Sequence, residues 1–381
     1  MRSGVFRWHE AARVSDETYV ERIARAEPRF GDILYSREGT YFGIAAEMPE
    51  NMRVCLGQRM VLIRPNPKQV NFRFLRLWLN SPVLSRHLHG FRDGTVAERL
   101  NMPTIRGLPV PILPRDEQDG IADLLGSLDD KIELNRQMNE TLEAMAQAIF
   151  RDWFVDFGPT RRKLNGATDP VEITGGLVQD AERARALADL FSAKLGDGGL
   201  PEGWNIGRVE DVLELAYGKS LPKGDRREGQ IPVYGSGGVG GFHDQALAQG
   251  PSVIVGRKGT VGSLYWEDGG FFPIDTVFFV RSEYPMTYCY YLLQTLGLEH
   301  MNTDAAVPGL NRNNAYRLVV SKPADALVSE FGKLSELLRS KISLNEQESR
   351  TLAATRDLLL PKLMSGEVCL PEAEEMLEAA Q

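Results

Sequence analysis

Two short motifs in this chain resemble nucleotide-binding loops, but the residues around each one argue against that chemistry. The run GSGGVG at 235–240 follows the apolar segment IPVY and fits the G-x-G-x-x-G pattern of a dinucleotide-binding loop. Only GFHDQALAQ at 241–249 separates it from Gly250, which leaves no helix for a βαβ unit. The run YGKS at 217–220 is not a phosphate-binding loop, because Leu213 stands where the first glycine of that loop belongs. We therefore expect no bound nucleotide.

Other catalytic groupings are also missing from the sequence. It contains no Asn-Pro-Pro-Tyr or Asp-Pro-Pro-Tyr tetrapeptide for amino-methyl transfer, no nucleophile elbow and no cluster of histidines and cysteines. Cys55, Cys289 and Cys369 are odd in number and far apart, which predicts reduced structural thiols and no metal site. We expect a chain that is not an enzyme and has no cofactor. Its polar, glycine-rich loops fit a contact surface, since small residues let a ligand approach the backbone.

A long segment of the chain occurs twice. LDDKIELNRQMNETLEAMAQAIF at 128–150 aligns without a gap on LRSKISLNEQESRTLAATRDLLL at 338–360. Shorter matches precede each copy, namely REGT (37–40) with RKGT (257–260), and Leu100-Asn101 with Leu310-Asn311. This period is too long for a solenoid. It predicts two copies of a module followed by a helix, related by a pseudo-two-fold axis.

Each repeated segment belongs to a long amphipathic helix, predicted at 115–157 and at 323–365. Apolar residues recur at helical spacing along the first helix, and Asn135 falls inside their row. The row comprises Ile121, Leu125, Leu128, Ile132, Met138, Leu142, Met145, Ile149 and Trp153. A narrow apolar seam needs a partner helix, so we expect an antiparallel, coiled-coil-like pair. Asn135 and its repeat Asn345 either fix the register of this pair or lie solvated at its edge.

The predicted modules occupy 1–114 and 204–322, with a connector at 158–203 and a C-terminal tail at 366–381. In the second module IPVYG, SVIVG and TVFFVR fit strands, whereas VEDVLELAY and TYCYYLLQTLGLEHM fit helices. The segments DILYS, QRMVLIR and FRFLRLWLN play the matching parts in the first module. The connector has loop residues on both sides of a short helical piece, AERARALADLFSAKL. The predicted fold class is α+β, with two duplicated modules separated by the long helices.

Charge is unevenly distributed along the chain. The net charge is −8, yet residues 1–112 hold 17 Lys+Arg against 11 Asp+Glu. The first module therefore has the charge to bind phosphate groups unaided, whereas the second needs a local basic patch. No apolar run reaches the roughly 20 residues of a membrane span, and the first residues lack the apolar core of a signal peptide. We expect a cytoplasmic protein.

Three further segments are similar to one known family. They are AIFRDWFVDFGPTRRK at 148–163, LPEGWNIGRVEDV at 200–212 and LLLPKLMSGEV at 358–368. With these segments and the duplication, the whole chain resembles the specificity subunits of Type I restriction-modification systems. The resemblance implies a non-catalytic subunit with two target-recognition domains, each reading one half of a bipartite site in double-stranded DNA. It also implies that the helices dock two adenine-methylating (modification) subunits, a core that nuclease-translocase (restriction) subunits can join. A second apolar face suits such docking, for instance Leu124, Leu134, Met145 and Phe150.

The start of the first module departs from the family pattern. About 50 residues precede VIVGRKGT in the second module, but only some 30 precede LYSREGT in the first, without a Gly-Trp opening. We expect an N-terminally shortened first domain, which reflects either a misassigned start or a truncated, inactive subunit. Two other interpretations stay open. One is a scaffold that assembles proteins without reading DNA; the other is a methyltransferase with its own recognition domains, which the missing cofactor motifs disfavour.

The repeat predicts which loop residues contact DNA. Arg and Lys suit phosphates and guanines, whereas Asn, Gln, Ser and Thr suit other base edges. In the first module we expect contacts from Arg37, Thr40 and Tyr41. In the second we expect them from Lys219, Ser220, Tyr234, Ser236, Arg257, Lys258, Thr260, Asn311 and Arg312. Trp153, Phe154 and Phe157 fit the core between helix and module better than a partner contact.

Overall fold

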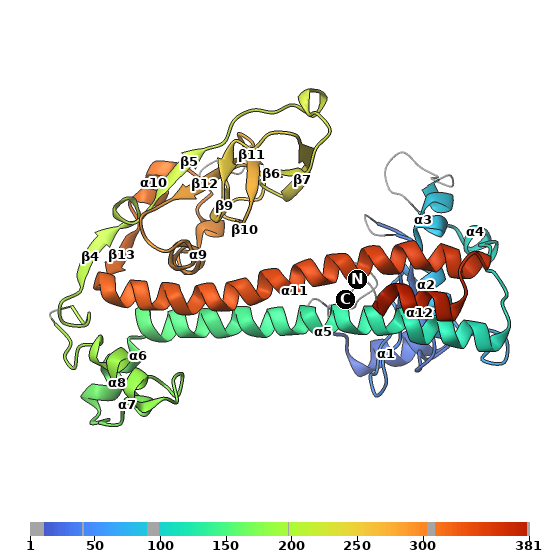
Figure 1. The fold of residues 1–381 in the computed structure, drawn as a ribbon, viewed down its shortest axis with the longest axis horizontal. Helices are drawn as coiled ribbons and strands as arrows, with labels where there is room; N and C mark the ends of the chain where they lie inside the picture. The colour runs from blue at the N-terminus through green and yellow to red at the C-terminus, as the bar shows by residue number, and fades with distance from the viewer. Residues whose placement is uncertain (1–10, 40–41, 90–98, 197, 303–308, 379–381) are drawn as a thin grey trace. The chain divides into compact units, whose positions relative to one another are not determined.

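The computed structural model describes residues 11–39, 42–89, 99–196, 198–302 and 309–378, which form two compact units. Unit 1 comprises Met1–Met138 and Leu344–Gln381, and unit 2 comprises Asn139–Ser343. Two long helices, α5 (Arg115–Phe154) and α11 (Asp325–Ser365), each contribute part of their length to both units (Figure 1). Within the described ranges, no helix is both long and apolar enough to cross a membrane.

Within each unit the two long helices lie side by side and run in opposite directions (Figure 1). In unit 1, Asn135 Nδ2 donates to Glu348 Oε2 at 2.7 Å and to the backbone oxygen of Asn345 at 3.4 Å. In unit 2, Asn139 Nδ2 donates to the backbone oxygen of Ile342 at 3.4 Å. Asn135 and Asn345 are each 2% exposed, so these two amides lie in the seam and not at its solvated edge. The antiparallel pair therefore has Asn135 against its own repeat.

The predicted seam of α5 is correct at both ends and wrong in the middle. Ile121, Leu125 and Trp153 are buried as expected. Met138 and Met145 are exposed instead, because the contacting row passes through Asn139 and Ala146. Prediction from apolar spacing passes over these two residues, since one is polar and the other is small.

Unit 1 builds a small module around a three-stranded antiparallel sheet of order β2-β1-β3. Its elements are α1 (Asp16–Ile23), β1 (Ile33–Ser36), β2 (Ala45–Glu47), β3 (Met60–Ile63), α2 (Phe72–Leu79), α3 (Pro82–His89), α4 (Met102–Arg106) and α12 (Leu370–Glu378). Helix α2 begins after Asn71, whose side-chain oxygen accepts from the next turn's backbone N–H groups. Its buried residues Phe74 and Leu77 pack in one core with Ile121 of α5 and Leu359 of α11. This core fixes the module to its portion of the helix pair.

A cluster of charged side chains also attaches this module to the two long helices. Arg76 of α2 is 15% exposed; its Nε donates to Glu47 at 2.6 Å and its Nη2 to Asp129 at 2.7 Å. Arg356 of α11 donates to the other oxygen of Asp129. Burial disfavours the charge on Arg76, but the Asp129 and Glu47 carboxylates outweigh it and raise the pKa of the guanidinium. Strand β2, helix α2 and both long helices thus meet in one ionic network.

Unit 2 holds the larger module, with two four-stranded sheets of order β10-β9-β12-β5 and β7-β6-β11-β8, and a β13-β4 pair. Its helices and turns are α6 (Gly158–Leu164), α7 (Pro170–Ile173), α8 (Ala181–Asp189), η2 (Val209–Asp211), η3 (Lys223–Asp225), α9 (Met286–Gln294), η4 (Leu298–His300) and α10 (Arg312–Tyr316). Its strands are β4 (Asn205–Arg208), β5 (Glu214–Tyr217), β6 (Ile231–Gly235), β7 (Gly238–His243), β8 (Ala248–Gln249), β9 (Ser252–Gly256), β10 (Leu264–Glu267), β11 (Gly270–Pro273), β12 (Val277–Arg281) and β13 (Val319–Lys322). The α+β class with two modules and two long helices is confirmed.

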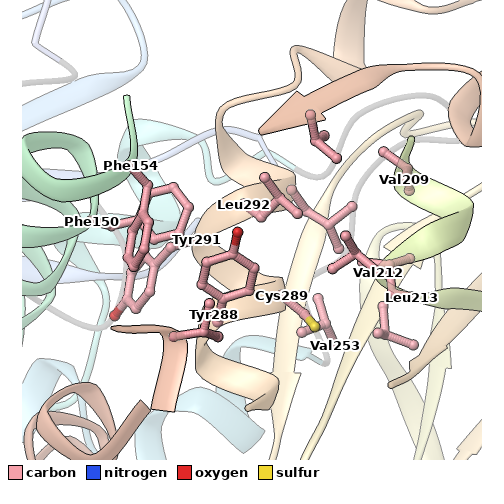
Figure 2. Close-up of a cluster of buried hydrophobic side chains, with 14 of the residues drawn as sticks. Phe150, Phe154, Val209, Val212, Leu213, Val253, Tyr288, Cys289, Tyr291 and Leu292 are labelled. Carbon is pink, nitrogen blue, oxygen red and sulfur yellow. The ribbon is translucent and has the colours of Figure 1, made fainter. Parts of the chain in front are cut away.

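The end of α5 is buried in the core of unit 2, where aromatic side chains of α5 face those of α9 (Figure 2). Phe150, Trp153 and Phe154 are 2%, 2% and 4% exposed. The Phe150 ring lies 5.5 Å from Tyr288 of α9 and 5.4 Å from Phe331 of α11. The core prediction for Trp153 and Phe154 is confirmed, whereas the prediction of Phe150 on an exposed docking face is wrong.

One segment of the second module differs from the sequence prediction, and the connector contains more helix than the sequence predicts. VEDVLELAY is not a helix: it forms the turn η2 and strand β5, because Leu215 and Ala216 are buried where β5 pairs with β12. GSGGVG lies in the β6–β7 hairpin, which is followed by no helix, as expected. In the connector, α8 is confirmed, and α6 and α7 are additional short helices.

The two modules share one β framework. In each, a central strand (β1 or β9) pairs antiparallel with two neighbours, β2 and β3 or β10 and β12. Strand β5 and the second sheet of unit 2 have no counterpart among the residues described in unit 1.

Candidate nucleic-acid interface

The turn after β9 is held in place by main-chain hydrogen bonds on two sides. The N–H groups of Arg257 and Lys258 both donate to the carbonyl of Thr276, at 2.9 and 3.1 Å. The carbonyl of Arg257 accepts from Leu310 N–H at 2.8 Å. The turn RKGT is therefore anchored to the start of β12 and to the residue ahead of Asn311, so a rigid sheet presents its side chains.

The first module repeats this arrangement at the equivalent residues. Arg37 follows β1, its N–H donates to Arg59 O at 2.9 Å, and its carbonyl accepts from Leu100 N–H at 2.8 Å. Asn101 then caps α4, as Asn311 caps α10. The repeated Leu-Asn pair thus has a structural basis: the leucine side chain is buried in the core of its module, and the asparagine caps a short helix. Thr40 and Tyr41, which we also predicted as contacts, lie outside the described residues.

Arg257 and Arg312 both lie over the ring of Tyr217 beside this turn. Their Cζ atoms lie 5.0 and 4.7 Å from the ring centroid of Tyr217, at the end of β5. The Nη1 of Arg257 also donates to the carbonyl of Asp275 at 3.0 Å. Asn311 is exposed, but its side-chain oxygen is already used by the N–H groups of Asn313 and Asn314, so its amide NH₂ group is the part available for a ligand.

The predicted contact residues on the neighbouring loops are mostly exposed. Lys219, Ser220, Lys258 and Thr260 all have exposed side chains. Lys219 is placed by its N–H, which donates to Pro273 O at 3.0 Å. In the described part of the chain neither lysine forms an ion pair, so each offers a mobile positive charge at the surface.

Ser236 lies next to the RKGT turn, although it is 21 residues ahead of Arg257 in the chain. Its N–H faces Thr276 Oγ1 at 3.4 Å, and its carbonyl accepts from Ser263 Oγ at 2.8 Å. A methyl group added at Gly259 would come within 3.3 Å of Ser236 Oγ, so the turn and the β6–β7 hairpin are in contact. The structure therefore brings Ser236 together with Arg257, Lys258 and Thr260.

The surroundings of Tyr234 do not support its predicted role as a DNA contact. Its side chain is 6% exposed in a core with Ile254 and Phe271, and its hydroxyl donates to Glu267 at 2.9 Å. Tyr234 supports the sheet beneath the turn and does not reach the surface. The prediction followed its place next to a glycine-rich loop, which does not reveal that strand β6 is buried there.

Two residues near the turn were missed. Tyr217 is 48% exposed and close to both arginines, yet its partners are 40 and 95 residues further along the chain. Arg226 is held over the hairpin by its Nη1, which donates to Gly240 O at 2.7 Å. Only the pattern of an aromatic residue ending an edge strand signals Tyr217, and nothing local signals Arg226.

The family comparison fits both modules. A model of the Type I restriction modification DNA specificity domain matches residues 3–144 and 201–311, more than half of the chain. The chain belongs to this family. Each match within the specificity family covers one framework strand, β1 or β9, together with the turn that follows it. The resemblance drawn from the sequence is confirmed, and the modules are DNA-binding target-recognition domains of a specificity subunit.

Individual members of the specificity family are distant in sequence. The Type I restriction enzyme HindI specificity subunit of Haemophilus influenzae is 24% identical over 408 residues, covering 89% of this chain and 86% of that protein. The MjaIX specificity subunit of Methanocaldococcus jannaschii is 21% identical over 326 residues, covering 78% and 69%. The crystal structure of a Type-I restriction-modification system S subunit from M. genitalium matches with a TM-score of 0.50 at 19% identity, covering 88% and 83%. That last likeness shows a shared fold.

Proposed function

We propose that this chain is the non-catalytic subunit that selects the DNA target of a Type I restriction-modification complex. Each recognition domain would read one half of a bipartite site in double-stranded DNA. The observation that carries the proposal is the shared framework, in which the carbonyls of Arg37 and Arg257 accept from Leu100 and Leu310 at the same distance of 2.8 Å. Two equivalent turns, each headed by an arginine, fit two half-sites. Such a complex works where its DNA lies, in the cytoplasm.

The charge distribution supports DNA contact by different routes in the two domains. The first domain is basic as a whole, with 17 Lys+Arg against 11 Asp+Glu in residues 1–112. The second gathers Arg257, Lys258, Arg312 and Lys219 near one turn. Phosphate contacts from these cations would supply affinity, and base contacts would supply specificity.

The long helices would dock two methyltransferase subunits through exposed apolar side chains. Leu134 of α5 is 52% exposed, and its repeat Leu344 of α11 is 60% exposed. A pseudo-two-fold chain presents the same residue once per repeat, so two copies of one partner can bind in the same way. Restriction subunits would then join this core.

The direct test is to map methylated adenines in DNA exposed to the complex assembled with its modification subunits. A bipartite motif supports the proposal, whereas methylation without a sequence motif, or no specific duplex retained, contradicts it. Docking is tested with Leu134→Gln and Leu344→Gln, each of which should lower the number of bound methyltransferase subunits from two to one. Gln347→Ala, at an exposed polar position of α11, is the matched control. A lone chain that is monodisperse and binds its target would count against this docking role.

A further inference from the structure

Among the residues that the structure describes, the two arginines at the turn of the second domain have no counter-charge. Arg257 lies over Tyr217 and also 5.6 Å from the ring centroid of Phe278, while Arg312 lies 5.6 Å from that of Tyr316. Over the described ranges, neither guanidinium forms an ion pair with a carboxylate, and Arg312 Nε is buried without a hydrogen-bond partner. Two guanidinium groups over one ring, with no carboxylate paired to them among the described residues, favour a ligand that offers several acceptors.

Arg257 is also held in one orientation. Its backbone is bonded on both sides of the turn, its guanidinium lies over Tyr217 and Phe278, and Nη1 is occupied by the carbonyl of Asp275. The remaining edge, formed by Nε and Nη2, carries two parallel N–H donors. A guanidinium already fixed by packing loses little conformational entropy when it binds.

The major-groove edge of guanine presents two acceptors, N7 and O6, and their spacing matches the two parallel N–H donors of a guanidinium edge. A phosphate needs positive charge more than a fixed plane, and the exposed Lys258 and Lys219 offer mobile charges nearby. We propose that Arg257 reads a guanine in the half-site of the second domain, with Tyr217 and Arg312 as positioning residues. This inference rests on the proposed DNA-reading function.

The described residues of the first domain contain no equivalent of the two arginines over Tyr217. Arg37 occupies the position of Arg257, but Met102 stands where the repeat has Arg312, directly after the capping asparagine. Strand β5, which carries Tyr217, also has no counterpart in the described part of unit 1. At the two positions that the repeat allows us to compare, the first domain therefore has one arginine where the second has two.

The test uses the complex assembled with its modification subunits and carrying Arg257→Lys, which keeps the charge and removes the paired donors. Arg281→Lys is the matched control, because Arg281 also lies over a ring, 5.0 Å from Phe279, but at the other end of β12. Lys258→Ala reports on phosphate contact in the same turn. For each complex, competition binding compares the cognate duplex with a set of variant duplexes. Each variant duplex has one base pair of one half-site replaced, and the set covers both half-sites.

Arg257→Lys should relax discrimination at one G·C pair of one half-site by roughly 5- to 150-fold, the selectivity that one bidentate base contact provides. The other half-site should be unchanged. Lys258→Ala should weaken all duplexes about equally and reduce the salt dependence by about one charge. Arg281→Lys should behave as wild type. Tyr217→Ala should relax discrimination at the same position, and Tyr217→Phe should restore it.

Three results would overturn the inference while leaving the proposed function standing. The first is a bipartite motif with no fixed G·C pair in either half. The second is wild-type discrimination in the Arg257→Lys complex. The third is a loss of affinity in the Arg257→Lys complex that is equal for all duplexes, which marks a phosphate contact. Failure of the proposed function itself is distinct, because the wild-type complex would then retain no specific duplex.

Discussion

Replacement of Arg76 by Met should loosen the attachment of the first domain to its helices. The change keeps the apolar stem of the side chain but leaves Glu47 and Asp129, 24% and 14% exposed, without the cation that now lies 2.6 and 2.7 Å from them. Removal of one partner of a buried ion pair costs about 3 to 5 kcal/mol. Here each carboxylate keeps a second cation, Arg73 or Arg356, so we expect the low end, about 3 kcal/mol.

Hydrogen–deuterium exchange of the full chain in the assembled complex measures this loss locally. In the Met variant, amides of α2 and of the facing part of α5 should exchange roughly 100-fold faster, since about 1.4 kcal/mol corresponds to a factor of ten. Arg73→Met is the control on the same helix, because Arg73 is 40% exposed and 3.7 Å from Glu47. The Arg73→Met change should lower the local stability by less than about 1 kcal/mol. Equal exchange in both variants, or less than threefold acceleration in Arg76→Met, would refute this account of the network.

Three smaller predictions concern other sites. Asn135→Ala removes the 2.7 Å hydrogen bond to Glu348 and should cost about 1 to 3 kcal/mol, seen as faster exchange confined to the middle of α5 and α11; unchanged exchange would speak against a register role. Burial raises the pKa of the Cys289 thiol to about 11, so it should stay protonated, and iodoacetamide at pH 8 should modify the exposed Cys369 but not Cys289 unless the chain unfolds. In Gly218→Ala, the new methyl group would lie 2.2 Å from a carbonyl oxygen of the β11–β12 connection, so we expect a loss of about 1 to 3 kcal/mol and weaker DNA binding; wild-type binding and stability would contradict that close approach.

The long helices were predictable because their signal is local and repeated. Apolar spacing over α5 and α11 gave ends within three residues of those observed, as expected for elements of 40 and 41 residues. The last turn of α5 was overestimated, because Phe157 adopts a left-handed conformation and Pro159 starts a new helix there. The composition of VEDVLELAY predicts a helix, and only the pairing of β5 with β12 makes this segment a strand.

The candidate site was predictable where the repeat marked it. REGT and RKGT follow apolar strands in both copies, so the turns could be located from sequence alone. The stacking of Arg257 and Arg312 on Tyr217 could not, because it joins three segments that are distant in the chain and that only the sheet brings together. The burial of Tyr234 was hidden for the same reason, since a residue beside a glycine-rich loop can face either side of the strand.

Under the proposed function, the hydrogen bonds that hold the turns after β1 and β9 have a consequence for how such a chain changes its target. They join main-chain groups only, from Leu100 to Arg37 and from Leu310 to Arg257, so no particular side chain is needed to keep them. Substitutions on the exposed side of either turn would therefore alter the proposed DNA contacts at little cost in folding free energy. Each domain also has its own core, so one can diverge while the other stays as it was. New target sequences are thus within reach of single substitutions, without the stabilising changes that a new fold would demand.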